Sequence, residues 1–426
     1  MRPATHLPSL DTNQLPPGIY VGVDTHKDTH HVAAVDELGR AIADKQFLAV
    51  GSGYRQIVDF LRDLGIVQAV GIEGTGSYGA ELARTLATAG MRVVDVARAD
   101  RSERRLRGKS DPIDARQAAL SVLAGRGLAT PKQRDGLAES IRMLLAERTS
   151  AAKARTATIN QIHAQLVTAP EAVRADFRRY EGDKLLEVLA RTRPARGATP
   201  DHVCRLCLKR LSHRALNLAR EITDIDTDLE HLTRQSNPAL ISAHGVGPVV
   251  AGTLLAALGD NPARVGTKAQ FAALCGVAPI PASSGVRHRH RLSRGGDRQA
   301  NAALHRIVLS RRRHKDPRTM AYFDKRRAEG LSDRDIVRCL KRHVANEVFA
   351  LLTRPELSTP QGSLLRQQRQ ALHLAMTEVA QQLGVPYQRL RRLEMGERSD
   401  AELQNAYQIW LDALKQQTAK PAQNAA

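Results

Sequence analysis

Two short apolar runs each end in an acidic residue, and this pattern constrains the fold more than any other feature of the chain. The run from Ile19 to Val23 is followed by Asp24. The run from Val67 to Ile72 is followed by Glu73. Short runs rich in valine and isoleucine predict buried strands. If the two strands are parallel neighbours, both carboxylates lie at the same edge of one sheet.

Two further acids stand at the start of a predicted helix. Asp111 and Asp114 are three residues apart in the segment KSDPIDARQAA, so a helix places them on one face. Hard divalent cations prefer oxygen ligands, and sites built from several carboxylates support displacement at a phosphodiester. The four acids together therefore predict a metal-dependent phosphoryl-transfer site.

Each acid also has an ordinary structural explanation. An aspartate after a strand is often a turn residue or a helix N-cap. Asp111 precedes Pro112, which favours the first position of a helix, so Asp111 is also a candidate cap. The four acids occur together at the ends of two predicted strands and the start of a predicted helix. This combination favours a metal site over a separate structural explanation for each acid.

Residues 18 to 124 have the periodicity of a mixed α/β domain. Three strands come first, and helices then alternate with strands, which is the order of a ribonuclease-H-like domain. The predicted strands cover 19–24, 30–36, 40–47, 67–73 and 92–96, and the predicted helices cover 54–64, 80–89 and 112–123. A Rossmann domain is a weaker alternative, because Gly74, Gly76 and Gly79 lack the spacing of the dinucleotide fingerprint.

The excess of basic residues indicates a polyanionic partner. The chain has 64 Lys plus Arg against 44 Asp plus Glu, a net charge of +20, and a pI near 10.4. A charge of this sign and size points to nucleic acid. No apolar stretch approaches the roughly 20 residues that span a membrane. The N-terminal segment also lacks a signal-peptide pattern, so we expect a cytosolic protein with no membrane partner.

The four cysteines predict neither a disulfide framework nor a zinc site. They are too few for a framework in a chain of 426 residues. Cys204 and Cys207 have the spacing of half a zinc site, but no second ligand pair accompanies them.

From about Leu137 to Leu232 the sequence consists of long charged runs in which apolar residues recur at intervals of three and four. Examples of these apolar residues are Ile141, Leu144, Leu145, Ile159, Ile162 and Leu166. The spacing predicts helices that pair with each other, as in a coiled coil, or with a second subunit. The segment RTRPARGATP between them predicts a loop. A charged helical face is usually just solvated, so this pattern leaves a dimer open.

A Gly-Val-Gly turn separates two apolar runs near residue 245. In a helix-hairpin-helix, such a turn presents backbone N–H groups to a phosphate, with Gly245 and Gly247 allowing close approach. Gly245 is equally well explained as an ordinary helix C-cap. The sequence therefore leaves both interpretations open at this turn.

A serine pair and a dense basic cluster follow. Ser283 and Ser284 precede Gly285. The basic cluster comprises Arg287, His288, Arg289, His290, Arg291, Arg294 and Arg298. Serine becomes a nucleophile when a base, a metal or positive charge assists it, and guanidinium groups stabilise a phosphoryl transition state. The simpler explanation, which spacing alone favours, is a Ser-Gly turn whose arginines contact phosphates.

The motifs in this order resemble one family. They are D-T-H-K at Asp24, I-E-x-T-G at Glu73, K-S-D-x-x-D-A at Asp111 and Asp114, and a later Ser-Ser-Gly segment followed by S-R-G-G-D-R. Over residues 18 to about 352 the chain resembles a DEDD-type transposase of the insertion-sequence one-ten family, which is related to the invertase Piv. The resemblance is specific, because four motifs occur in the family's order.

The resemblance implies an activity and its partners. It implies a RuvC-like domain that binds Mg²⁺, with Mn²⁺ as a possible substitute, through Asp24, Glu73, Asp111 and Asp114. It implies a helical coiled-coil region and a transposase domain whose serine, Ser284 or alternatively Ser283, joins covalently to DNA. It further implies donor and target double-stranded DNA, a structured non-coding bridge RNA that specifies both, and a homo-oligomer of two to four subunits.

The C-terminal segment departs from the usual family pattern. It resembles a Cro-like (XRE) helix-turn-helix, with Thr377 as the N-cap and Gly384 in the turn. The expected small core contains Val379, Ala380, Leu383, Leu390 and Leu393. The expected base or phosphate contacts are Tyr387, Gln388, Arg389 and Arg391. A copy used only for protein contacts is the alternative.

The prediction is therefore an α/β plus all-α recombinase of a bacterial mobile element. Its expected segments are a disordered leader (1–17), a RuvC-like DEDD domain (18–125), a helical dimerisation region (126–235), a serine-bearing transposase domain (236–355), a helix-turn-helix (356–415) and a disordered tail (416–426). One alternative is a Holliday-junction resolvase, which uses four acids without a serine. The other is a DNA-binding regulator with an inactive nuclease fold.

Overall fold

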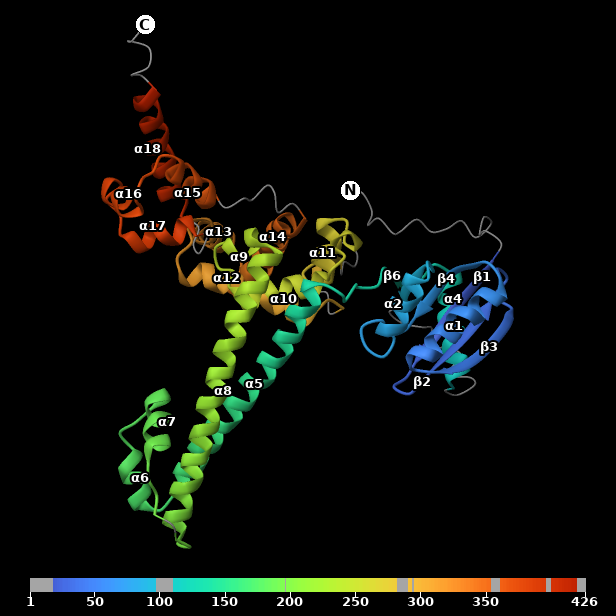
Figure 1. Cartoon of the computed structure of the whole chain (residues 1–426), viewed down its shortest axis with the longest axis horizontal. Coiled ribbons are helices and arrows are strands. Elements are labelled where there is room, and N and C mark those ends of the chain that lie inside the picture. The colour runs from blue at the N-terminus through green and yellow to red at the C-terminus, as the bar shows by residue number, and fades with distance from the viewer. Residues whose placement is uncertain are drawn as a thin grey trace. The chain divides into compact units, whose positions relative to one another are not determined.

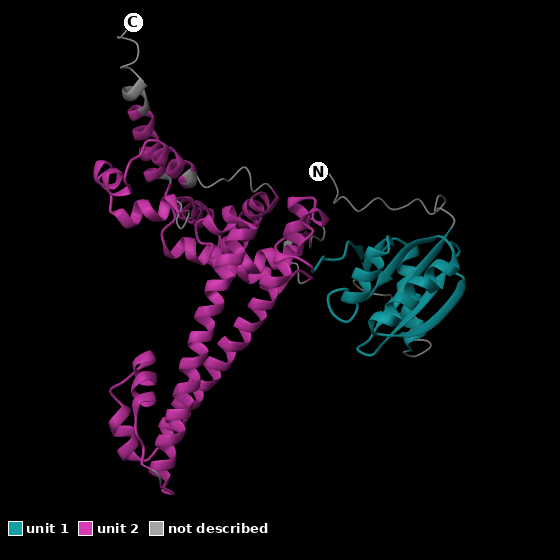
Figure 2. Ribbon diagram, viewed as in Figure 1, with its two compact units in different colours: residues 1–134 teal, residues 135–426 magenta. Residues whose placement is uncertain are grey.

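The computed structural model describes residues 18–96, 110–195, 197–281, 290–292, 295–353, 361–395 and 400–419. The chain divides into two compact units, residues 1–134 and residues 135–426 (Figure 2). Each unit has hydrophobic cores of its own. Any finer division into domains remains a prediction.

The first unit is built on a six-stranded sheet with the strand order β3-β2-β1-β4-β5-β6 (Figure 1). Its strands are β1 (Ile19–Thr25), β2 (Thr29–Val35), β3 (Ala41–Leu48), β4 (Val67–Ile72), β5 (Val93–Val96) and β6 (Leu128–Ala129). The first three strands pair antiparallel, whereas β1, β4 and β5 are parallel. The predicted element order is confirmed, apart from the short β6, and it is compatible with a RuvC-like domain.

Helices cover both faces of this sheet. They are α1 (Gly51–Leu64), α2 (Ala80–Thr88) and α4 (Asp111–Leu123). Successive residues of a strand point to opposite faces. Val21 and Val23 accordingly belong to the core with α1 and α2, while Tyr20 belongs to the core with α4.

Small residues let α4 approach β1 closely. A Cβ atom added at Gly22 would lie 2.1 Å from the backbone oxygen of Ala115 and 2.2 Å from the nitrogen of Ala119. These distances leave no room for any side chain on the strand at this point. The contact therefore fixes α4 over the middle of β1, with the first turn of α4 toward the strand's C-terminal end.

The second unit begins with a pair of long helices that lie side by side (Figure 1). They are α5 (Leu137–Thr168) and α8 (Pro200–Ser236), and α6 (Glu171–Phe177) and α7 (Gly182–Arg191) lie between them in the chain. Ile162 shares one core with Leu208, and Ile141 shares another with Leu229, so the two helices run antiparallel. The long helices are confirmed, whereas coiled-coil packing and a dimer role remain predictions.

A helical core follows, centred on α10, which is almost wholly apolar. Its elements are α9 (Pro238–Ser242), α10 (Pro248–Leu258), η2 (Pro262–Arg264), α11 (Lys268–Leu274), β7 (Pro279–Pro281), β8 (His290–Leu292), α12 (Arg298–Arg313), α13 (Pro317–Ala328) and α14 (Asp333–Thr353). Residues from α10, α11, α12 and α14 form one continuous core. A helix buried on every side needs apolar residues around its whole circumference, which explains the composition of α10.

The C-terminal segment forms four helices around a separate core. They are α15 (Gln361–Ala371), α16 (Met376–Gln382), α17 (Tyr387–Glu394) and α18 (Ala401–Ala419), so α18 continues past the predicted domain end at 415. The predicted core residues Val379, Ala380, Leu390 and Leu393 are buried, and Leu383 packs against them. Gly384 has φ +62° in the turn before α17, as this position requires.

One detail of this segment was predicted wrongly. Thr377 is the second residue of α16 and not its N-cap, which is Ala375. The N–H of Ala375 donates instead to the carboxylate of Glu378, at 3.0 Å. The helix therefore begins two residues earlier than expected, and the side chain of Glu378 satisfies the N–H of Ala375 at its start.

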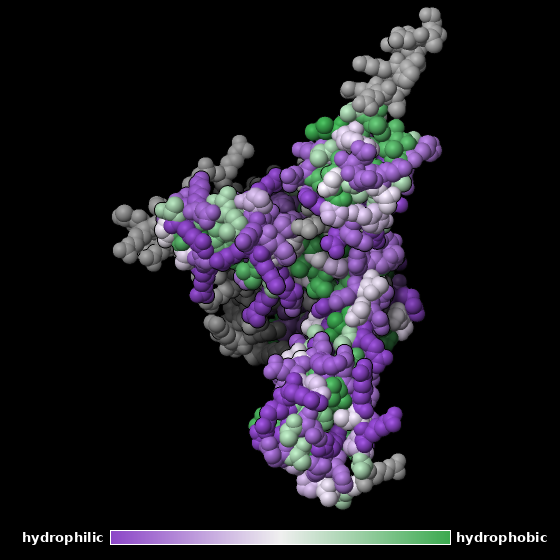
Figure 3. All heavy atoms as spheres, turned by 90° about the vertical axis from the view of Figure 1, so that its left-hand side faces the viewer, coloured by the Kyte–Doolittle hydropathy of each residue, from purple (hydrophilic) through white to green (hydrophobic). Residues whose placement is uncertain are grey.

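None of the helices in the described ranges is both long and apolar enough to cross a membrane. On the face drawn in Figure 3, hydrophilic residues predominate, and hydrophobic residues lie in small scattered groups.

The contact at Gly22 generates a prediction. Gly22→Ala is expected to lower the free energy of unfolding by about 2 kcal/mol, because the new methyl group overlaps backbone atoms of α4. The matched control is Gly51→Ala, where the new Cβ would meet the Arg55 guanidinium at an ordinary contact distance of 3.9 Å. Thermal melting of the two full-length variants is the measurement. Equal melting temperatures would contradict the close packing.

Candidate metal centre

Asp24 and Glu73 lie at the adjacent C-terminal ends of two parallel strands. β1 and β4 are paired up to Val23 and Ile72, and the N–H of Glu73 donates to the carbonyl of Val23 at 3.3 Å. The Thr25 hydroxyl donates to the Glu73 carbonyl at 2.8 Å. The prediction that β1 and β4 are parallel neighbours is therefore confirmed, and their backbones bring Asp24 and Glu73 to the same end of the sheet.

Strand alternation places Asp24 on the face covered by α4. Tyr20, Gly22 and Asp24 are two residues apart, and the first two contact α4. Asp111 is the first residue of α4, and Asp114 lies in its first turn. The N-cap of α4 is Ser110, so the explanation of Asp111 as a helix cap is wrong. The close packing of α4 on β1 thus brings these acids toward one another.

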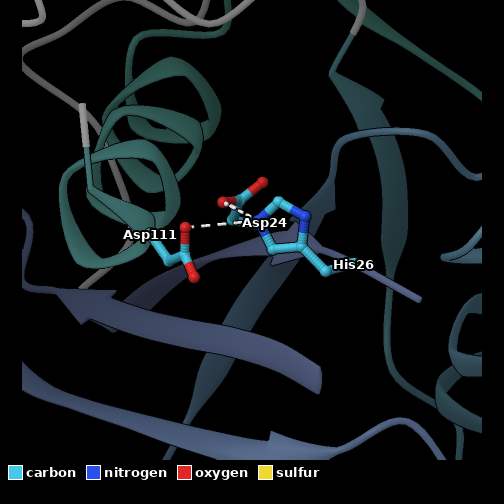
Figure 4. A group of neighbouring side chains, drawn as sticks. All are labelled: Asp24, His26 and Asp111. Carbon is cyan, nitrogen blue, oxygen red and sulfur yellow. Dashed lines mark hydrogen bonds and ion pairs between the residues drawn. The ribbon is translucent and has the colours of Figure 1, made fainter. Parts of the chain in front are cut away.

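A histidine stands between two of the carboxylates (Figure 4). Nε2 of His26 lies 3.2 Å from Oδ2 of Asp24 and 3.2 Å from Oδ1 of Asp111. Among the described residues, the ligand atoms of Asp24, His26 and Asp111 form one group within 4.8 Å of one another. Carboxylate oxygens and an imidazole nitrogen are a donor set that binds divalent cations.

His26 was missed by the sequence analysis, although a signal was present. It follows Asp24 by two residues and lies one residue beyond the end of β1, so strand alternation continued past Thr25 would have placed both side chains on the same face. Glu73 and Asp114 do not belong to the group of close ligand atoms. Asp114 is nevertheless near enough to Asp24 for its charge to raise the pKa of that carboxyl.

Burial makes the charge of Asp24 costly. Its residue is 7% exposed, and desolvation raises the pKa of the Asp24 carboxyl above its ordinary value. His26 acts in the opposite direction, and the negative charges of Asp114 and Asp111 raise the pKa further. Asp114 is also buried, at 2% exposure. Acids crowded in this way fit a site that binds a cation, because a positive charge offsets both their desolvation and their mutual repulsion.

The serine pair and most of the basic cluster lie outside the described residues. These are Ser283, Ser284, Arg287, His288, Arg289 and Arg294. β7 and β8 pair antiparallel on either side of the serines, with Pro281 opposite His290. Arg291 belongs to β8, and Arg298 is the exposed first residue of α12.

The glycine turn joins α9 to α10 as predicted. Gly245 has φ +81°, and Gly247 is the N-cap of α10. The C-cap of α9 is Ala243, so Gly245 belongs to the connecting turn and is not that helix's C-cap. Contact of this turn with phosphate remains a prediction.

The expected DNA contacts of the C-terminal segment lie on α17. Tyr387, Gln388 and Arg389 are exposed in its first turn, and Arg391 is half-buried. Arg389 forms an ion pair with Asp400, with Nε and Oδ2 2.7 Å apart. This pair holds the Arg389 guanidinium in a fixed position, and its contact with DNA remains a prediction.

Two family models match the chain. A model for the DEDD domain of IS110 enzymes, described as Transposase, matches residues 21–169. A second, described as Transposase IS116/IS110/IS902 family, matches residues 237–324. The first match includes all four acids and His26, and the second includes the serine pair. The DEDD model indicates the use of a divalent metal.

Relatives encoded by insertion elements align with most of the chain. The IS110 43.6 kDa protein of Streptomyces coelicolor is 26% identical over 383 residues, which cover 79% of this chain and 94% of the relative. The mini-circle putative transposase for IS117 of the same organism is 24% identical, with 78% and 92% covered. An IS900 42 kDa protein of Mycobacterium paratuberculosis is 30% identical over a shorter stretch, 34% of this chain and 36% of the relative. With both transposase regions matched and two relatives aligned along most of their length, the chain belongs to the IS110 family of insertion-sequence transposases.

Proposed function

We propose that this transposase cleaves and rejoins DNA strands at a divalent-cation site formed by Asp24, Glu73, Asp111 and Asp114. Mg²⁺ is the proposed cation, and Mn²⁺ is a chemically similar substitute. The observation that carries the proposal is the convergence of buried Asp24 with Asp111 and His26 at the end of β1. A bound divalent cation would supply Lewis-acid stabilisation of the negative charge that develops on a phosphodiester.

The residues around the site have distinct proposed tasks. The carboxylates bind the cation, and the close contact of α4 with β1 holds them in place. His26 lies within ion-pair distance of two of these carboxylates, so its proposed task is to orient them. Burial of Asp24 and Asp114 excludes bulk water from this side of the site and strengthens their attraction for a cation.

We further propose that Ser284 is the nucleophile, with Ser283 as the alternative. Its hydroxyl oxygen would form a bond to phosphorus while the bond from phosphorus to the leaving DNA oxygen breaks. The serine proton would pass to a base, and the leaving oxygen would take up a proton. The support is the position of the serines within the matched transposase region, beside a cluster of arginines.

The proposed partners are DNA, RNA and further copies of the chain. The formal charge of +20 supports binding to polyanions. The resemblance to bridge-RNA-guided recombinases supports a structured RNA that selects donor and target, and a dimer or tetramer. Phosphate contacts are proposed for Gly245 and Gly247 and for the basic cluster. Tyr387, Gln388, Arg389 and Arg391 are proposed to contact DNA at the C-terminal segment.

One prediction from the proposed function concerns Asp24 and the stability of the protein without metal. Because the pKa of Asp24 is raised, its ionised form destabilises the fold at pH values above that pKa. Asp24→Asn should therefore melt at a higher temperature than the wild type at neutral pH in EDTA, and the difference should shrink as the pH falls through the raised pKa. Added Mg²⁺ should raise the melting temperature of the wild type and not that of Asp24→Asn.

The matched control is Asp28→Asn, which removes an exposed acid from the turn after β1. It should respond to pH and to Mg²⁺ as the wild type does. An Asp24→Asn protein that gains as much stability from Mg²⁺ as the wild type would remove Asp24 from the metal site.

A second prediction concerns strand cleavage. Asp24→Asn and Asp114→Asn should each slow cleavage and strand exchange about 100-fold or more, because each removes a charge that holds the cation. Both variants should still fold and bind nucleic acid. The measurement is strand cleavage and exchange on element-end DNA, again with Asp28→Asn as the control. Recombination by Asp24→Asn at the wild-type rate would refute the proposed site.

A third prediction concerns the serine. Reactions stopped with denaturant should contain protein attached to a DNA end, and Ser284→Ala should abolish this adduct while Ser283→Ala retains it. The reverse result would assign the role to Ser283. Cleavage that requires the acids but forms no adduct in the wild type would favour a resolvase. Absence of any cleavage would favour a DNA-binding regulator.

A further inference from the structure

A cationic groove lies between α12 and α14 in the second unit. Its volume is about 390 Å³. It is lined by His305, Arg312, Asp333, Arg334, Val337, Arg338 and Lys341. Four of these side chains are formally positive and one is negative. No residue of the groove belongs to the acidic site described above.

The spacing of the lining residues explains why they meet. Arg334, Arg338 and Lys341 are four and three residues apart, so they share one face of α14. His305 and Arg312 are seven apart and share one face of α12. The core between these helices holds the two faces against each other. The groove is therefore built by two regular helices and not by loops.

The acids near the groove do not balance its positive charge. Asp333 accepts from Arg312 at 2.7 Å and also pairs with Arg327, which does not line the groove. Arg338 pairs with Asp335 at its exposed side, 2.8 Å away. In the described part of the chain, no ion pair involves Arg334.

Lys341 differs from the other cations of the groove because it is buried and donates to a neutral side chain. Its residue is 9% exposed, and its ammonium donates to the side-chain oxygen of Asn301 at 2.9 Å, which is a neutral partner. Burial and the nearby charge of Arg338 lower the pKa of Lys341. Lys341 in turn lowers the pKa of His305, after the larger effect of burial. A buried ammonium without a carboxylate is unfavourable, and an anion in the groove would offset the cost.

We propose that the groove between α12 and α14 binds a phosphate of a nucleic-acid backbone. This inference rests on the proposed function, because it names a surface with which the transposase holds its nucleic acid. Guanidinium groups donate in a fork that matches phosphate oxygens, and Arg334 and Arg338 stand one helical turn apart on the groove wall. Lys341 supplies a point charge at the floor beside the apolar Val337.

The groove also connects to the base of the β7 and β8 hairpin. The side-chain amide of Asn301, which binds Lys341, donates to the carbonyls of Cys275 at 2.9 Å and Gly276 at 3.1 Å. These carbonyls lie just before β7. A backbone phosphate bound near Lys341 would therefore be one side chain away from the segment that leads into the hairpin.

The test is nucleic-acid binding by the full-length protein in EDTA, at several salt concentrations. The variants are the double substitution Arg334→Gln with Arg338→Gln, and separately Lys341→Gln, which keeps a donor for Asn301. The probes are a DNA duplex and a hairpin RNA, both of arbitrary sequence. Each lost phosphate contact should reduce the slope of log K against log salt by about 0.9 on the duplex. The double variant should bind about tenfold more weakly or worse.

The matched control is Arg318→Gln, an exposed arginine of α13 that does not line the groove. Weaker binding and a smaller slope for the groove variants but not for this control support the proposal. An effect on DNA alone or on RNA alone identifies the source of the phosphate. Groove variants that keep the affinity and the salt slope of the wild type on both probes would overturn the proposal. Binding in EDTA does not require cleavage. A negative result in this assay therefore contradicts the groove alone, whereas negative results in the cleavage and adduct experiments contradict the proposed acidic site and serine.

Discussion

The close approach of α4 to β1 is the contact on which the candidate site depends. Gly22 leaves room for the backbone of α4, and the alanines of that helix complete a contact without large side chains. Dispersion and burial at such a contact are sensitive to a single added methyl group, since protein interiors are packed without spare volume. The acids of α4 begin at its first residue. Their distance from Asp24 is thus set by packing in the middle of the sheet.

The two units handle charge in complementary ways. In the first, Asp114 and Asp111 lie close enough to the buried Asp24 that their negative charges raise the pKa of its carboxyl. In the second, a buried lysine stands among arginines with a neutral partner. Each arrangement is unfavourable in isolation and becomes favourable with an ion of opposite sign. The proposed function, in which a divalent cation acts on a polyanion, would use both kinds of surface.

The sequence predicted the first unit well, because its signals are local. Short apolar runs rich in valine and isoleucine identified β1 and β4, and the acids that follow them identified their common edge. His26 could not be assigned in the same way, since it is not an acid and lies one residue beyond the end of β1. The groove of α12 and α14 was beyond sequence reasoning for a different reason. Its residues come from helices separated in the chain, and only the folded core brings His305 opposite Lys341.

The C-terminal helices have a core that shares no residue with the rest of the second unit. Within it, the Arg369 guanidinium pairs with the buried Glu394 carboxylate, which also accepts from the Tyr407 hydroxyl at 2.8 Å. All three side chains come from within this segment, so its polar network is satisfied internally. A segment whose core and polar network are both internal can tolerate substitutions on its exposed face without disturbing the packing of the helices that precede it.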